Sequence, residues 1–145
     1  KDYLEQVTGC SSYEGLRTWF LQKITDVCRN ITSKQEEQTE GIVTRVKQYI
    51  NSNFQKDISL DGVSEMVNIS PYYFSKVFKD EAGENFIEYL TKVRMENAKE
   101  YLKNPELSVK EICAMSGYGD PNYFSRIFKK YIGVTPSEYR ERLGQ

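Results

Sequence analysis

The sequence predicts an all-α protein containing two similar helix-turn-helix subdomains that are joined by a long connector helix. Two segments fifty residues apart, 70–83 and 120–133, have nearly the same sequence, SPYYFSKVFKDEAG and DPNYFSRIFKKYIG. Each begins with a polar residue and a proline and ends at a glycine, which are common boundaries of a helix. The repeat extends outward to Ser59 and Ser108, which match at an offset of 49. Two copies indicate two similar subdomains, because a solenoid needs at least three repeats.

The first forty residues combine a helical period with a polar stretch. From Tyr13 to about Ile31, apolar side chains recur every three or four residues, which predicts a helix. This helix either packs on the rest of the domain or serves as a connecting or dimerising helix, because its stripe is close to a heptad. Residues 32–40 contain no apolar side chain and are predicted to be a solvated linker or exposed helix. We therefore expect residues 1–40 to be a helical linker and a possible site of homodimer formation.

The rest of the chain has the caps and periods of further helices, about eight in all. They cover, in order, about 41–53, 60–67, 70–83, 84–103, 108–115, 120–133 and the residues after Thr135. Their N-termini are predicted from Ser59 as an N-cap and from three pairs with capping-box spacing, Asn85 with Glu88, Ser108 with Glu111 and Thr135 with Glu138. The expected organisation is a first subdomain at about 41–83, a connector at about 84–104 and a second subdomain at about 105–145.

Composition removes several classes of function. The chain has a net charge of −1 and no histidine, so His-based triads and His-containing zinc sites are excluded. It has no glycine-rich phosphate loop, and we expect no catalytic activity, no cofactor and no metal. Its three cysteines are not closely paired, which fits a reducing cytoplasm. No apolar run is long enough to span a membrane.

Each repeated helix has an apolar stripe and a polar face. Phe74 and Phe78 form one stripe and Phe124 and Phe128 the other, and we predict that all four lie in the core. The opposite faces carry hydroxyls, an amide and cations: Tyr72, Ser75, Lys76 and Lys79 in the first copy, and Asn122, Ser125, Arg126 and Lys129 in the second. Such faces suit binding to another macromolecule better than catalysis.

The last hundred residues resemble the DNA-binding domain of the AraC/XylS family of bacterial transcription regulators. The resemblance rests on Gly117-Tyr118, on the run from Asp120 to Lys130, and on Gly133, Thr135-Pro136 and Tyr139-Arg140. It implies that 70–83 and 120–133 are recognition helices for double-stranded DNA and that RNA polymerase is a further partner. Residues 1–40 are similar to the helical linker of AraC-type response regulators, in which a phosphorylatable receiver precedes this domain.

The resemblance and the chemistry of the major groove together suggest individual contacts. The expected base contacts are Tyr72, Ser75, Lys76, Asn122, Ser125 and Arg126, with Arg126 matched to the O6/N7 edge of guanine. The expected phosphate contacts are Ser59, Lys79, Ser108, Lys129, Lys130 and Thr135. Lys76 stands where the second copy has Arg126, and lysine lacks the bidentate fork of arginine. The alternative function is a helical protein-interaction module without specific DNA binding.

Overall fold

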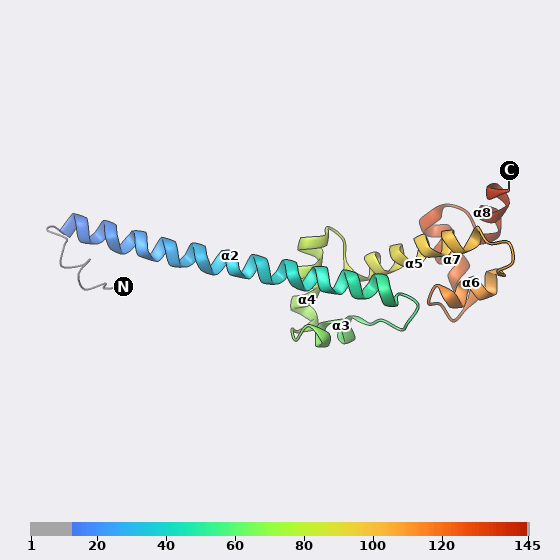
Figure 1. Ribbon diagram of the computed structural model, residues 1–145, viewed down its shortest axis with the longest axis horizontal. Coiled ribbons are helices and arrows are strands. Elements are labelled where there is room, and N and C mark those ends of the chain that lie inside the picture. The colour runs from blue at the N-terminus through green and yellow to red at the C-terminus, as the bar shows by residue number, and fades with distance from the viewer. Residues whose placement is uncertain (1–12, 145) are drawn as a thin grey trace. The chain divides into compact units, whose positions relative to one another are not determined.

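The computed structural model describes residues 13–144, and within that range every regular element is a helix (Figure 1). The helices are α2 (Tyr13–Asn53), α3 (Leu60–Met66), α4 (Pro71–Ala82), α5 (Phe86–Leu102), α6 (Val109–Met115), α7 (Pro121–Ile132) and α8 (Pro136–Leu143). The predicted all-α class and the pair of helix-turn-helix motifs are confirmed. Cys10 lies outside the described residues, as does the rest of the segment before Tyr13.

The helix α2 differs from the prediction of two helices with a polar stretch between them. It is continuous through residues 32–40, so this polar stretch is exposed helix rather than a linker. Its glutamates, glutamines and lysine are good helix formers, which explains why the helix continues without an apolar face. The chain divides into two units after Gly41, within α2, and residues 42–144 are described below as the C-terminal region.

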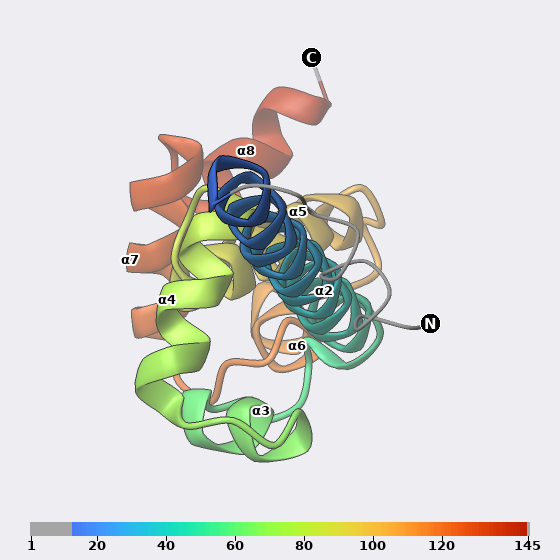
Figure 2. The same ribbon diagram turned by 90° about the vertical axis from the view of Figure 1, so that its left-hand side faces the viewer.

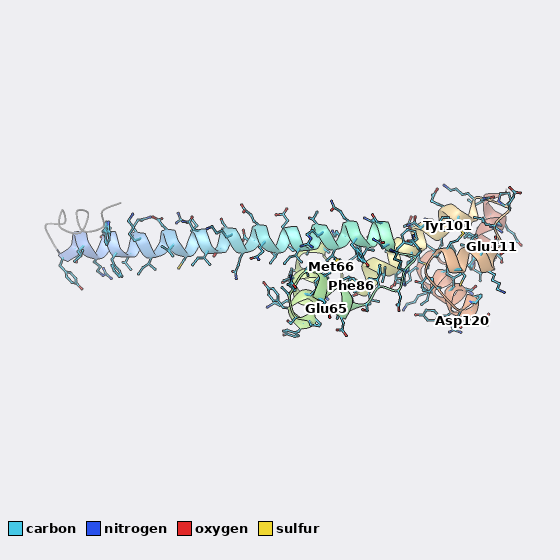
Figure 3. All side chains as sticks on the ribbon, turned by 60° about the horizontal axis from the view of Figure 1, so that its bottom comes forward. Glu65, Met66, Phe86, Tyr101, Glu111 and Asp120 are labelled. Carbon is cyan, nitrogen blue, oxygen red and sulfur yellow. The ribbon has the colours of Figure 1, made fainter. Side chains whose placement is uncertain are left out.

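Two hydrophobic cores divide the C-terminal region. The first core contains Val43, Val46 and Ile50 of α2, Val63 of α3, Val77 and the two phenylalanines of α4, and Phe86 and Leu90 of α5. The second contains Met95, Ala98 and Leu102 of α5, Ile112 and Cys113 of α6, and the two phenylalanines of α7. We call residues 42–83 the first half and residues 103–144 the second half. Helix α5 belongs to both cores and therefore connects the halves as a packed element (Figures 1 and 3).

The predicted helix boundaries agree with the observed caps. Asn85, Ser108 and Thr135 each start a helix with a complete capping box, in which the side chain accepts from the third helical N–H and the glutamate accepts from the cap N–H. Gly83 and Gly133 end α4 and α7 in the left-handed conformation that glycine adopts readily. The four phenylalanines of α4 and α7 are completely buried, as predicted. Met115, the last residue of α6, is 37% exposed.

The two helix-turn-helix motifs are joined by turns of different length. Four residues (67–70) separate α3 from α4, and five (116–120) separate α6 from α7, so the second turn contains the extra residue that the repeat predicted. Both turns use a left-handed residue at the same place, Asn68 with φ 59° in the first and Gly117 with φ 97° in the second. The reason for glycine in the second turn is described below.

Candidate nucleic-acid interface

The expected recognition helices, α4 and α7, place most of the predicted site residues at the surface. Tyr72 is 84% exposed, and Lys76 and Lys79 are exposed beside it on α4. On α7 the predicted site residues that are exposed are Asn122, Arg126, Lys129 and Lys130. Ser75 and Ser125 occupy matching positions, and both are half-buried, so less of each hydroxyl is accessible. Within the C-terminal region, α4 and α7 lie on the same side of α5 (Figure 2).

The charge on the two helices is unequal. Helix α7 carries Arg126, Lys129 and Lys130 and contains no acidic residue, although its N-cap is Asp120. Helix α4 carries Lys76 and Lys79, but the acidic Asp80 and Glu81 follow directly. A local positive potential favours contact with phosphates, and it is greater on α7.

Arg126 is held in place by an aromatic side chain. Its guanidinium carbon lies 5.8 Å from the centre of the Tyr123 ring, a cation–π distance. Tyr123 is 45% exposed, and Tyr73, its counterpart on α4, is 40% exposed. Both tyrosines are therefore about half-buried, with part of each ring at the surface. The ring of Tyr123 restricts the arginine side chain and leaves its fork of donors free to contact a base edge.

The three hydroxyl residues expected to bind phosphate act as N-caps in this structure. The side-chain oxygens of Ser59, Ser108 and Thr135 accept hydrogen bonds from the N–H groups of Gly62, Glu111 and Glu138 at 3.0, 3.1 and 3.2 Å. At Ser108 and Thr135 the capping glutamate also places a carboxylate beside the helix N-terminus, and this charge repels a phosphate. The cap at Ser59 has no such glutamate, because Gly62 occupies the corresponding position.

Two arginines make contacts that the sequence analysis did not anticipate. Arg94 of α5 donates from Nε to the Phe54 carbonyl and from Nη2 to the Lys56 carbonyl, both at 2.8 Å. Arg140 of α8 donates in the same way to the carbonyls of Leu102 and Asn104, at 3.2 and 3.1 Å. The acceptors lie 36 to 40 residues away along the chain, so no local pattern could identify them.

The described residues of α4 and α7 form a polar, partly cationic face at the surface. In residues 13–144 no group of three His, Cys, Asp or Glu side chains is placed to hold a metal ion. No helix in the same range has the length and apolar character needed to cross a membrane. What the arrangement supplies is two exposed polar helices on one side of a packed connector, and helices of this kind fit the major groove of B-DNA.

Several known proteins, and one family model, are similar in sequence to this chain. A family model described as a helix-turn-helix domain matches residues 63–142. YesN of Bacillus subtilis (strain 168), described as an uncharacterized transcriptional regulatory protein, is 48% identical over 82 residues, covering 55% of this chain and 22% of YesN. The chain spans between 18% and 44% of the length of the curated relatives it matches.

Solved structures of similar proteins have the same fold. The C-terminal domain of AraT, a response regulator from Geobacillus stearothermophilus, superimposes with a TM-score of 0.68 and is 46% identical, covering 70% of this chain and 84% of that one. The C-terminal domain of the two-component response regulator yesN from Fusobacterium nucleatum has a TM-score of 0.64 and 37% identity, covering 67% and 96%.

Proposed function

The chain belongs to the AraC-type helix-turn-helix family of DNA-binding regulators, and from this we propose that it places α4 and α7 in adjacent major-groove segments of one DNA site. The observation that carries the proposal is the position of these two capped helices on the same side of a connector that is part of both cores (Figure 2). The packed connector fixes the separation of the helices, so the site in DNA should have two parts at one spacing.

We assign different roles to the side chains on the two helices. On α7, Arg126 and Asn122 contact base edges, because an arginine fork matches guanine and an amide matches adenine. On α4, Tyr72, Ser75 and Lys76 contact bases in the adjacent major-groove segment, with fewer rigid donors. Ser125 on α7 is the counterpart of Ser75 and contacts bases as well. Lys79, Lys129 and Lys130 bind phosphates, together with the helix N-termini that follow Ser59, Ser108 and Thr135. Of these three, Ser59 is the strongest choice because no glutamate accepts from its own N–H, and the only acidic side chain in the first turn of α3 is Asp61.

The test is selection of duplexes from a random DNA pool by the 145-residue chain, followed by titration at several salt concentrations. We expect one bipartite sequence and a tightening of at least about 1000-fold over unrelated DNA. The affinity should fall steeply with salt, because lysines and arginines displace counterions from phosphates. Sequence-independent binding would contradict the proposal and would favour the alternative, a protein-interaction module, which family membership does not support.

We further propose that the chain is the DNA-binding output of a longer response regulator in the bacterial cytoplasm. The support is its similarity to two response-regulator C-terminal domains and its short span of the curated relatives. We propose RNA polymerase as a further partner, and in vitro transcription from the selected DNA site tests this proposal.

We also propose a homodimer formed through the N-terminal segment of α2. Phe20, Ile24, Val27 and Ile31 are 48 to 57% exposed, and they follow the alternating spacing of a coiled-coil seam. Ile24 and Ile31 are seven residues apart and therefore occupy equivalent heptad positions of this seam. Sedimentation should show a dimer that Ile24→Asp dissociates, whereas Thr25→Asp on a neighbouring face leaves it intact. A monomer at all concentrations would contradict this proposal.

A further inference from the structure

Arg94 lies where the two halves of the C-terminal region meet. It projects from the middle of α5, and its guanidinium donates to two carbonyls of the segment between α2 and α3, those of Phe54 and Lys56. The same guanidinium lies over the ring of Tyr118, at 5.2 Å from the ring centre. Tyr118 belongs to the turn of the second half. One side chain of the connector therefore contacts both the first half and the second half.

The backbone at Gly117 adapts to this arrangement. A Cβ at this position would lie 2.7 Å from the Phe54 carbonyl oxygen and 2.9 Å from Arg94 Nε, closer than atoms can approach without displacement. Asn68, at the same place in the first turn, has a side chain and is exposed. Left-handed backbone alone does not require glycine, since Asn68 adopts it as well. The glycine at 117 is needed because the first half approaches the second turn at this point.

Aromatic contacts continue from Tyr118 to the recognition helix. The centres of the Tyr118 and Tyr123 rings are 6.0 Å apart, and Arg126 lies over the opposite end of this pair, 5.8 Å from the centre of Tyr123. Burial raises the pKa of the Tyr118 hydroxyl and the Arg94 guanidinium opposes this shift, as expected for a ring covered by a cation. A series of contacts therefore joins the segment after α2 to Arg126, the expected base-contacting side chain. It runs from Arg94 through Tyr118 and Tyr123.

The first half has no equivalent series. The residues aligned with Tyr118, Tyr123 and Arg126 are Ile69, Tyr73 and Lys76. Arg140 has the same two-carbonyl geometry as Arg94, but it lies in the second half and donates to the end of α5 and the residues directly after it. Arg140 therefore anchors α8 locally, and it provides a matched control for a bridge between the halves.

We propose that Arg94 is a positioning residue that fixes the spacing between the two recognition helices and, through Tyr118 and Tyr123, the orientation of Arg126. We call Arg94, with its contacts to Phe54, Lys56, Gly117 and Tyr118, the Arg94 bridge. This inference rests on the proposed function, because it assigns the origin of the spacing that a bipartite site requires. The Arg94 bridge, as well as the connector helix, then determines the spacing between the two recognition helices.

The first test uses the DNA sequence selected by the 145-residue chain and derivatives with one or two base pairs added or removed between its two parts. Arg94→Gln removes the charged fork, Arg94→Lys keeps the charge without the fork, and Arg140→Gln removes an equivalent pair of hydrogen bonds elsewhere. We expect Arg94→Gln to bind the selected DNA about tenfold more weakly, as loss of a charge-assisted pair implies. Its preference for the selected spacing over the altered spacings should fall to within about threefold.

The control should separate positioning from stability. Arg140→Gln should keep the spacing preference of the wild type even if its melting temperature falls as much as that of Arg94→Gln. Arg94→Lys should resemble Arg94→Gln, because a point charge cannot donate to two carbonyls with fixed geometry. Tyr118→Leu keeps the hydrogen bonds of Arg94 but removes the ring, so it should relax only the base preference at the Arg126 contact.

A second measurement needs no DNA and does not depend on the proposed function. Spin labels at Glu65→Cys in α3 and Lys110→Cys in α6, both exposed, report the distance between the halves after Cys10 and Cys28 are replaced by serine. The wild type should give one narrow distance distribution, and Arg94→Gln should at least double its width. Arg140→Gln should leave the width unchanged. Failure to select a DNA sequence while this result holds would reject the proposed function alone.

The proposal is overturned if Arg94→Gln keeps both the narrow distribution and the wild-type spacing preference, or if Arg140→Gln changes them equally. If Arg94→Gln fails to fold, Arg94→Lys carries the same two measurements and decides the outcome.

Discussion

The two halves of the C-terminal region share a fold but differ in how they use it. Each half has a capped short helix, a turn, and a longer helix with two buried phenylalanines. Each half also packs a phenylalanine edge-on against the tyrosine of the following helix, Phe78 against Tyr89 of α5 and Phe128 against Tyr139 of α8, both at 5.7 Å between ring centres. The common contacts are internal, so the repeat preserves the core.

The differences lie in the turns and on the exposed faces. The first turn has Asn68 and Ile69 where the second has Gly117 and Tyr118. The second turn thereby approaches the first half and carries the ring that leads toward Arg126, whereas the first turn remains at the surface. The comparison teaches that a duplicated motif can diverge where the copies meet each other and where they meet a ligand, while the core stays similar.

The largest effect should come from separating the two parts of the DNA site. With its caps, α5 spans 85–103, about 28 Å at ~1.5 Å per residue, and major-groove faces recur about every 34 Å. Inserting half a helical turn of DNA moves one part to the far face, and inserting a full turn restores the face but not the distance. Both insertions should weaken binding about 100-fold or more, because the base contacts of one half are lost.

Titration of these DNA duplexes by fluorescence anisotropy provides the measurement, with the uninterrupted duplex as control. Recovery of full affinity by the full-turn insertion would mean that the halves are flexibly tethered. It would contradict the proposal that α5 holds the two recognition helices at one separation.

Exchanging the turn residues tests why the turns differ. Gly117→Asn gives the second turn the residue of the first, and its Cβ would collide with the Phe54 carbonyl and Arg94. We expect a loss of about 1–3 kcal/mol in the free energy of unfolding, the usual cost of overpacking. Asn68→Gly, the reverse exchange at an exposed position, should change it by about 0.5 kcal/mol or less. Chemical denaturation measures both, and equal losses would show that close approach does not distinguish the turns.

The fold was largely predictable from local sequence, because the relevant signals are local. Caps such as Ser108 with Glu111 and the spacing of Phe124 and Phe128 each lie within one helical turn, and the structure confirms them. For residues 32–40 the sequence left two alternatives open, a solvated linker and exposed helix, because apolar periodicity does not distinguish them, and the structure shows the helix.

The site was predictable only as two polar faces. The exposure of Tyr72, Asn122 and Arg126 follows from their position opposite the phenylalanines. The contacts of Arg94 join residues about forty positions apart, and Gly117 resembled an ordinary turn glycine. Contacts of this kind depend on tertiary packing, which neither propensity nor periodicity describes. The individual base and phosphate contacts remain predictions.

The next effect separates base contacts from phosphate contacts on the two recognition helices. Arg126→Ala should cost about 1–3 kcal/mol of specific affinity and relax the preference at one base pair. Lys129→Ala should weaken all sequences alike and reduce the salt dependence. The matched change in the first half, Lys76→Arg, supplies a fork where lysine now stands and should sharpen the preference at one position. The affinities of each variant protein for all single-base variants of the selected DNA distinguish base contacts from phosphate contacts. Uniform weakening by Arg126→Ala would contradict the assignment of Arg126 as a base contact.

The smallest effect concerns the acid sensitivity of α8 in the second half. Glu138 accepts from the Thr135 N–H at 2.9 Å, while the Thr135 hydroxyl accepts from the Glu138 N–H. Donation from the Thr135 N–H to the carboxylate, aided by the Thr135 hydroxyl and to a smaller extent by Lys129 and Arg142, holds the pKa of Glu138 below its usual value of 4.5. A carboxylate with a lowered pKa in the folded state stabilises the fold above its unfolded pKa, and the stabilisation is lost as pH falls through the folded value. The difference in melting temperature between wild type and Glu138→Gln should therefore be constant from pH 7 to about 5 and should shrink below about pH 4.5.

Glu88 provides the comparison with the connector helix, because it completes the same capping box at the start of α5. Helix α5 has 17 residues and takes part in both cores, whereas α8 has 8 residues and buries only Pro136 completely. A short helix with few buried contacts depends more on its cap than a long packed one. At pH 7, Glu138→Gln should thus lower the hydrogen-exchange protection of the amides in α8, whereas Glu88→Gln should leave the protection of α5 nearly unchanged. Hydrogen exchange resolves the two helices separately, and an equal loss of protection in both would show that tertiary packing does not set the importance of the cap.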